Sequence, residues 1–299
     1  MPKRKGLSLE KKQSLVGWLF LSIATILLIW LCFYPMFKAL QMSFKTGIGT
    51  NLKYAGLRNY QQLFKDSKFI AALKNNFTYL IIQVPIMLVL ALIIATMLNN
   101  PNLKFRGLFR TAIFLPCATS LVSYSLIFRS MFSNEGFINV MLMKLGLISQ
   151  NINWLTDSSA PHLARAVIII ALIWRWTGYN MVFYLSGLQN IEPSVYEAAR
   201  IDGAGPIRQF FQITVPLLKP TILLTAIMST NGTLQLFDES VNIANGGPGT
   251  ATITMSHYIY NTSFWGNPKF GYAAAMSIVI LVMVAILSFI QLKVGDKRD

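Results

Sequence analysis

The chain has 299 residues, of which 54% are apolar and only 12% are charged, and its mean hydropathy is +0.51. Soluble globular domains carry about 25% charged residues, so this composition excludes that class and indicates a membrane protein. The formal net charge of +15 would suggest nucleic-acid binding in a soluble chain. In a membrane chain it reflects loop cations beside anionic lipid, so we expect membrane lipid and no nucleic acid as a partner.

Residues that commonly bind metals or perform catalysis are sparse. Cys32 and Cys117 both fall in apolar stretches, and His162 and His257 are far apart in the sequence. These positions form neither a disulfide framework nor a zinc spacing. We therefore expect no metal, no cofactor and no catalytic residue, which argues against a membrane-embedded enzyme.

The N-terminal segment 1–14 is basic and precedes the first apolar stretch, Leu15–Phe37. This stretch is longer than the apolar core of a signal peptide and is followed by no A-x-A cleavage pattern. The sequence therefore predicts a basic tail over 1–14 and a retained first transmembrane helix.

Six apolar stretches are long enough to cross a bilayer, which takes roughly 20 residues at helical rise. They are Leu15–Phe37, Phe77–Leu98, Leu108–Phe132, Leu163–Leu188, Leu217–Phe237 and Tyr272–Leu292. The third to fifth stretches contain polar or charged residues, and such residues at membrane depth usually face a bundle interior or an aqueous path. We therefore predict an all-α membrane protein with six transmembrane helices in one domain, 15–299, whose third to fifth helices line a route.

Orientation is predicted from the distribution of Lys and Arg. Cations gather in the N-terminal tail, the second and fourth connections and the C-terminal end, which places both termini in the cytoplasm. The first external loop is discordant because it holds seven cations. It is long, so we expect part of it to be structured away from the bilayer, where the charge rule weakens.

The segment 190–216 lies between two apolar stretches and contains turn signals. Ser194 and Glu197 have the spacing of a capping box, which predicts a helix start. Gly203 and Gly205 permit the left-handed turn that ends a helix, and Pro206 suits the first turn of a second one. For the capping box alone, a plain capped interfacial helix, in which Glu197 only caps, is the favoured interpretation.

A second helix is expected over Ile207–Val215, and Ala198 and Ala199 predict a small-residue face on the first. The run Glu197-Ala198-Ala199, with Gly203 and Pro216 at their spacings, resembles the EAA loop of ATP-binding-cassette (ABC) importer permeases. Further stretches also resemble the carbohydrate-uptake branch of that family over about residues 15–295: Gly56-Leu57-Arg58-Asn59-Tyr60, Leu115-Pro116, Trp174, Gly178-Tyr179, Gly246-Gly247-Pro248 and Phe270-Gly271-Tyr272. Two positions depart from the family pattern, Val215 and the Ile191-Glu192-Pro193 start of the first helix.

The resemblance implies a type I ABC importer permease fold whose cytoplasmic coupling helix docks on a separate ATPase subunit. It assigns the mechanical coupling to Glu197, Ala198, Ala199, Asp202 and Gly203. It also implies a second homologous permease and an extracytoplasmic sugar-binding protein as partners. The chain has no G-x-x-x-x-G-K-[ST] loop, so the nucleotide would be hydrolysed by a partner chain.

Sugars require hydroxyl, amide and aromatic groups in a mostly apolar tunnel. Six residues of the fourth and fifth predicted helices supply this chemistry: Trp174, Tyr179, Asn180, Ser229, Thr233 and Gln235. The alternative is that these side chains only hold the helices together, as Ser, Thr and Asn commonly do. Arg175 has two open explanations, snorkelling or an internal ion pair.

Other functions remain as alternatives to sugar import. A glycerol-phosphate permease of the same family would share length and motifs. A secondary transporter or channel usually has repeat symmetry and buried acidic residues for ion coupling, and the apolar stretches contain almost no Asp or Glu.

Overall fold

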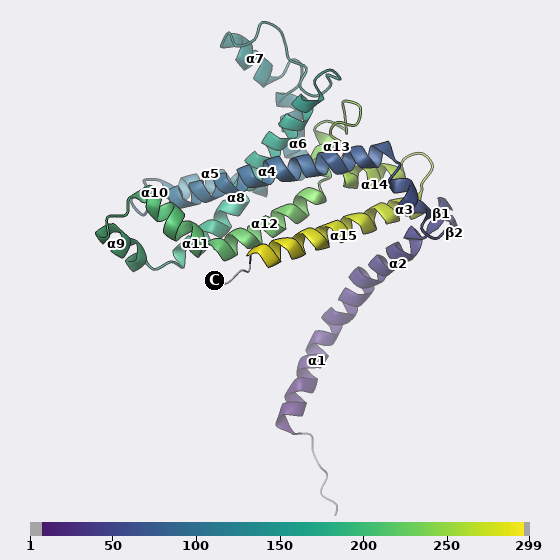
Figure 1. Cartoon of the computed structure of the whole chain (residues 1–299), viewed down its shortest axis with the longest axis horizontal. Helices are drawn as coiled ribbons and strands as arrows, with labels where there is room; N and C mark the ends of the chain where they lie inside the picture. The colour runs from purple at the N-terminus through teal and green to yellow at the C-terminus, as the bar shows by residue number, and fades with distance from the viewer. Residues whose placement is uncertain (1–7, 296–299) are drawn as a thin grey trace, which may run out of the picture. The chain divides into compact units, whose positions relative to one another are not determined.

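The computed structural model describes residues 8–295, which are mostly helical (Figure 1). Contacts between Cα atoms divide the chain into two compact units. The first holds the residues up to Gln61 together with Thr262–Ile278, and the second holds Gln62–Asn261 and the residues from Val279 onward.

The first unit begins with a continuous helix and a small hairpin. Its elements are α1 (Leu9–Leu28), a π-helical segment (Ile29–Phe33), α2 (Tyr34–Ser43), β1 (Lys45–Ile48), β2 (Asn51–Tyr54) and most of α3 (Arg58–Leu63). The strands pair antiparallel, with Lys45 opposite Tyr54 and Ile48 opposite Asn51. The all-α prediction therefore omitted a two-stranded hairpin, which lies in the cation-rich loop where the sequence predicts ordered structure.

Two close contacts fix this hairpin within its unit. The side-chain amide of Asn59 donates to the carbonyls of Ser43 and Lys45, at 2.8 Å each. Gly271 lies so near the hairpin that a Cβ atom there would clash with the Lys45 carbonyl. A hydrogen-bonded turn and a glycine contact thus order a segment that has little apolar periodicity.

The second unit is a helical bundle. Its elements are α4 (Ser67–Asn99), α5 (Arg106–Ala118), α6 (Leu121–Met131), α7 (Phe137–Lys144), α8 (Pro161–Gln189), α9 (Pro193–Ile201), α10 (Pro206–Gln209), a π-helical segment (Phe210–Thr214), α11 (Val215–Leu217), α12 (Lys219–Leu234) and α13 (Asp238–Asn242), while α14 (Met255–Phe264) and α15 (Phe270–Gly295) cross between the units. Helices α4, α8 and α12 contact one another (Figure 1). Asp66 caps α4 because its carboxylate accepts from the backbone N–H of Lys68 at 2.9 Å.

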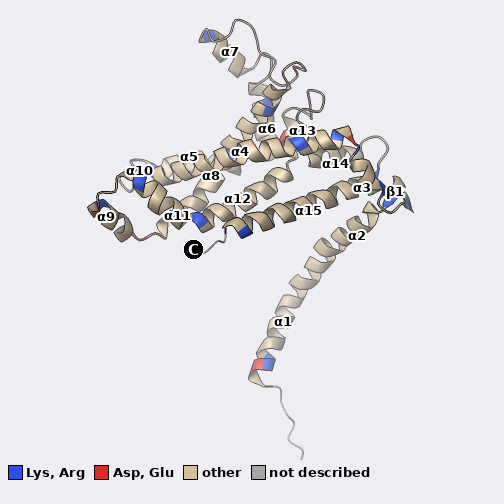
Figure 2. Ribbon diagram, in the orientation of Figure 1, with Lys and Arg blue, Asp and Glu red and all other residues tan. Residues whose placement is uncertain are grey.

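Each predicted span corresponds to a helix or to a bent pair of helices. Four helices are long and apolar enough to cross a membrane: Leu9–Ser43, Ser67–Asn99, Pro161–Gln189 and Phe270–Gly295. The third predicted span is broken by 96° between α5 and α6. The fifth predicted span corresponds to α12, and a bend of 69° at Leu218 separates α12 from the helices over Pro206–Leu217. The described residues therefore hold six spans if each bent pair counts as one. Figure 2 shows that charged residues lie near the ends of α4 and α15.

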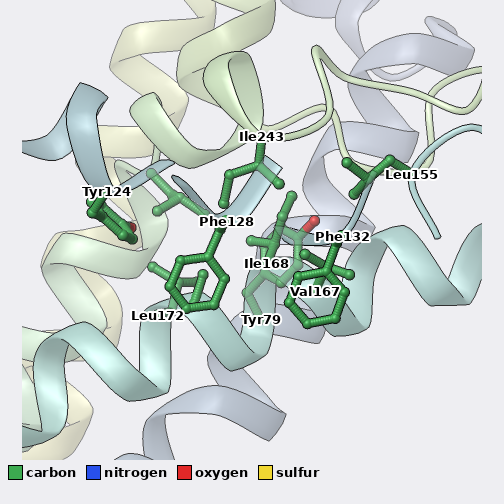
Figure 3. Close-up of a cluster of buried hydrophobic side chains, with 11 residues drawn as sticks. Tyr79, Tyr124, Phe128, Phe132, Leu155, Val167, Ile168, Leu172 and Ile243 are labelled. Atoms are coloured by element: carbon green, nitrogen blue, oxygen red, sulfur yellow. The ribbon is translucent and has the colours of Figure 1, made fainter. Parts of the chain in front are cut away.

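The core of the second unit joins α4, α6 and α8 (Figure 3). Tyr79 of α4, Tyr124 and Phe128 of α6, and Ile168 and Leu172 of α8 are buried in one cluster. The Phe128 ring of α6 lies against the Trp174 ring of α8, with centroids 5.5 Å apart. This aromatic packing holds α6 against α8 after the chain has turned sharply out of α5.

The break between α5 and α6 is held by Arg175 of α8. Its two terminal nitrogens donate to the carbonyls of Pro116 (3.0 Å), Cys117 (3.1 Å) and Thr119 (2.8 Å). These carbonyls lie at the C-terminal end of α5, where the regular helical hydrogen bonds stop, and the Pro116 carbonyl also accepts from the backbone N–H and the hydroxyl of Thr119, at 3.3 and 2.7 Å. Both explanations left open for Arg175, snorkelling and an ion pair, are therefore wrong: it satisfies a helix end inside the bundle.

Candidate functional site

A cavity of about 320 Å³ opens within the second unit. Its lining comes from α4, α6, α8, α12, the turn that follows α12, and α13: Gln83, Met87, Leu121, Leu172, Trp176, Tyr179, Asn180, Met228, Ser229, Gly232, Thr233, Gln235, Leu236, Phe237, Asp238 and Glu239. We refer to these residues as the cavity lining. A mostly apolar wall with a few amide, hydroxyl and acidic groups is typical of a small-molecule site.

Five of the six predicted path residues belong to the cavity lining, all except Trp174. Ser229 and Thr233 share a face of α12, as their spacing predicts. Trp174 is 48% exposed and its ring lies against Phe128, with centroids 5.5 Å apart. Two residues along a helix turn the side chain by about 200°, so Trp176 faces the cavity in its place.

The five residues differ in how their polar groups are used. The Thr233 hydroxyl donates to Gln83 at 3.1 Å, and the Asn180 amide donates to the Trp176 carbonyl at 2.9 Å. The Gln235 amide donates to the Asn231 side chain. The hydroxyls of Tyr179 and Ser229 have no hydrogen-bond partner among residues 8–295, and both side chains are half-buried. These two are therefore best placed to contact a solute, whereas Thr233 and Asn180 also hold the helices together.

The route prediction missed α4, which supplies Gln83 and Met87. The prediction also included all of the third span, yet of its two helices only α6 contributes a residue to the lining, Leu121. The signal in α4 was available, because Gln83 is an amide in the middle of an otherwise apolar stretch. Thr233 and the sulfur of Met87 both bond to Gln83, at 3.1 and 3.0 Å.

Glu239 is a buried acidic group of the cavity lining that the sequence did not reveal. Its carboxyl accepts a hydrogen bond from the Tyr124 hydroxyl, and its residue is 3% exposed. Burial raises the pKa of Glu239 above its usual range, and the Tyr124 bond opposes that change. The Tyr124 ring also carries the Arg175 guanidinium 4.5 Å from its centroid.

The segment 190–216 forms a second candidate site. Helix α9 ends in a turn at Gly203, whose φ of +78° requires the left-handed region. Gly205 has φ of −68° and begins α10, so the predicted left-handed role is wrong for Gly205. The Gln209 amide donates to the Ala204 carbonyl at 2.7 Å, and Tyr196 shares a 3.0 Å hydrogen bond with Thr214. These contacts fold the segment back on itself.

Four of the five predicted coupling residues are exposed: Glu197, Ala198, Asp202 and Gly203. Ala199 is buried, so the expected face of two alanines is wrong. Consecutive residues of a helix point about 100° apart, which leaves only Ala198 at the surface. Large apolar side chains flank it, with Ile201 87% and Ile207 77% exposed.

The predicted capping box is absent. Helix α9 begins at Pro193 after Glu192, and the Ser194 hydroxyl donates to Glu192 at 3.3 Å and not to the helix. Proline fixes its own φ and has no N–H, so it suits the first helical position, and the helix starts two residues earlier than the box requires. The second helix is also interrupted, since a π-helical segment separates α10 from α11.

Comparison with known proteins identifies the relatives. Residues 64–298 match the family model of the binding-protein-dependent transport system inner membrane component. The lactose transport system permease protein LacF of Rhizobium radiobacter is 50% identical over 293 residues, covering 97% of each chain. The arabinooligosaccharides transport system permease protein AraP of Halalkalibacterium halodurans is 34% identical over 283 residues, covering 94% of this chain and 87% of that one.

Solved structures share the fold. A bacterial ABC transporter that imports the acidic polysaccharide alginate superposes with a TM-score of 0.83 at 25% identity, over 96% of this chain and 97% of that one. The same type of transporter, in complex with a periplasmic protein bound to an alginate pentasaccharide, superposes with a TM-score of 0.84 over 96% of both chains. These matches confirm the expected type I ABC importer permease fold.

Proposed function

The chain belongs to the family of binding-protein-dependent transport system inner membrane components, and from that premise we propose that it is the permease subunit of an ATP-driven importer of an oligosaccharide or simple sugar. The strongest support is the 50% identity to a lactose permease over nearly the whole of both chains. The arabinooligosaccharide relative supports the same substrate class. The alginate importer shows that the fold also serves an acidic polysaccharide, so fold alone does not select the charge of the solute.

The chemistry of the cavity supports a sugar as the solute. Trp176, Tyr179 and Phe237 offer aromatic faces, and Ser229 and Gln235 offer hydroxyl and amide groups. Sugar rings combine apolar C–H faces with hydroxyl rims, so they need both kinds of partner. In this proposal Tyr179 and Ser229 contact the solute, while Asn180 and Thr233 shape the wall.

We further propose that the segment 190–216 couples this subunit to an ATPase. Glu197, Ala198, Asp202 and Gly203 form its contact surface, and Ala199 anchors α9 from the inside. The exposed Ile201 and Ile207 side chains add apolar area beside them. A short helix closed by a tight turn can transmit a rigid-body movement, which a flexible loop would absorb.

The proposed assembly contains ABC ATPase subunits, a second homologous permease and an extracytoplasmic sugar-binding protein. The binding protein is supported by the structural relative, whose complex contains a periplasmic protein with a bound pentasaccharide. From the distribution of Lys and Arg we propose that both termini lie in the cytoplasm, and that the segment 190–216 lies on the same side of the membrane.

The decisive experiment isolates the tagged chain from gently solubilised membranes, identifies what copurifies, and assays the complex in proteoliposomes with radiolabelled lactose. The expected complex contains an ATPase and a second permease and accumulates sugar only with ATP and the binding protein. A chain that purifies alone and transports without ATP would overturn the proposal in favour of a secondary transporter.

A further inference from the structure

The cavity lining contains acidic residues but no basic ones. Asp238 and Glu239 are acidic, and no Lys, Arg or His belongs to the lining. Glu239 is buried and Asp238 is half-buried. Water and salt therefore screen a negative charge on either group less than they screen one on an open surface.

The positive charge of Arg175 reaches Glu239, but Arg175 presents no accessible nitrogen to the cavity. Arg175 lies behind Tyr124, with its guanidinium over the ring, and its terminal nitrogens are bonded to Pro116, Cys117 and Thr119 at the α5–α6 break. Its Nε is buried, so it offers no accessible donor. An anion in the cavity would find acidic neighbours and no guanidinium to bind.

We propose that Asp238 and Glu239 make this cavity selective for neutral, hydroxylated solutes against anions. This inference rests on the proposed function, and it narrows the substrate class. Sugar hydroxyls can donate to carboxyl oxygens, whereas a phosphate, sulfonate or carboxylate would bring negative charge beside the acidic pair without a cationic partner in the lining. Glycerol phosphate is thereby disfavoured as the substrate.

The lining charge can be measured without knowing the substrate. Ser229→Cys places a thiol on the cavity wall, in a chain whose Cys32 and Cys117 are replaced by Ala. The intact transporter is then treated with cationic trimethylammonioethyl and anionic sulfonatoethyl methanethiosulfonate. For each thiol we compare the rate of modification by the cationic reagent with the rate by the anionic one. We expect this rate ratio to be about tenfold or more higher for the introduced cysteine than for free 2-mercaptoethanol.

Variants assign that preference to the acidic pair. Asp238→Asn with Glu239→Gln should return the rate ratio to within about threefold of the free thiol, because the local potential is lost. Glu135→Gln replaces one acidic residue at an exposed position outside the lining and should leave the ratio unchanged. A ratio equal to that of the free thiol, or one that the double variant does not alter, overturns the proposal.

Protection of the introduced thiol by a bound solute tests the charge selectivity separately from the proposed sugar transport. Lactose should slow modification of the introduced thiol, and lactose 6-phosphate at the same concentration should not. Equal protection by both overturns the charge selectivity. If neither protects while the reagent ratio behaves as expected, the proposed sugar route fails and the exclusion of anions stands.

Discussion

The Arg175 guanidinium on α8 donates to both oxygens of Thr119, the carbonyl at 2.8 Å and the hydroxyl at 3.1 Å. Thr119 is the residue at which α5 ends in extended geometry before the chain turns by 96° into α6. One buried cation thus replaces the hydrogen bonds that a continuous helix would have made. In a bilayer such replacement is obligatory, since no water is available to the freed carbonyls.

Replacing Arg175 should destabilise the break between α5 and α6. We expect Arg175→Gln to lower the free energy of unfolding by about 3 kcal/mol, because several buried carbonyls lose a charged donor. Unfolding in mixed detergent micelles measures this. Lys144→Gln, at an exposed position, is the control and should change stability by less than about 0.5 kcal/mol. Full stability in Arg175→Lys would show that a positive charge alone suffices and that the planar arrangement of the guanidinium N–H donors is not needed.

A glycine sets the distance between α5 and α8. A Cβ atom on Gly178 would clash with the Ile113 carbonyl, whereas nothing lies within 4 Å of a Cβ on Gly107. Gly178→Ala should therefore cost about 1–3 kcal/mol of stability through displaced backbone. Gly107→Ala should be neutral or slightly stabilising. Thermal unfolding in detergent compares the two, and equal melting temperatures would refute the close approach.

The turn after α9 should be required for coupling. Gly203→Ala places a Cβ at φ of +78°, which costs about 1–2 kcal/mol, while Gly205→Ala keeps an ordinary φ of −68°. We expect the first variant to reduce sugar uptake per ATP hydrolysed and the second to leave it unchanged. Glu197→Lys should uncouple in the same way while inserting normally. Unimpaired uptake in Gly203→Ala and Glu197→Lys would remove the docking assignment.

Two hydroxyls of α12 should have different roles. Ser229→Ala should raise the KM for uptake by about 2–10-fold without affecting assembly, because one solute hydrogen bond is lost. Thr233→Val should instead lower stability by about 1 kcal/mol, since the side-chain oxygen of Gln83 loses the Thr233 hydrogen bond. Tyr179→Ala should behave as Ser229→Ala does. Dissociation of the subunits in Ser229→Ala would indicate that this serine only packs helices.

Stability should depend on pH through Glu239. Burial raises its pKa in the folded state, so the folded state binds the proton more tightly than the unfolded state does. The stabilisation is complete below the usual pKa of a glutamate and is lost as pH rises through the raised value. The melting temperature of the wild type minus that of Glu239→Gln should therefore be lower at pH 8 than at pH 5. A difference that grows with pH would mean that Tyr124 and Arg175 stabilise the ionised form.

The sequence by itself determined the membrane class, the six apolar stretches and the position of the turn at Gly203. Each depends on local information: a run of apolar residues long enough for a bilayer, or a residue that tolerates positive φ. The resemblance of the EAA loop added the family, which the comparisons confirm.

Only the tertiary structure decided which polar residues share a cavity and where Arg175 is used. Gln83 of α4 meets Thr233 of α12, and Glu239 meets Tyr124 of α6, across sequence separations of 150 and 115 residues. Helical periodicity gives the face on which a residue lies but not the helix that this face meets. The choice between Trp174 and Trp176 was decided by the rotation of α8 against its neighbours, because packing between helices sets that rotation and one chain's local pattern does not encode it.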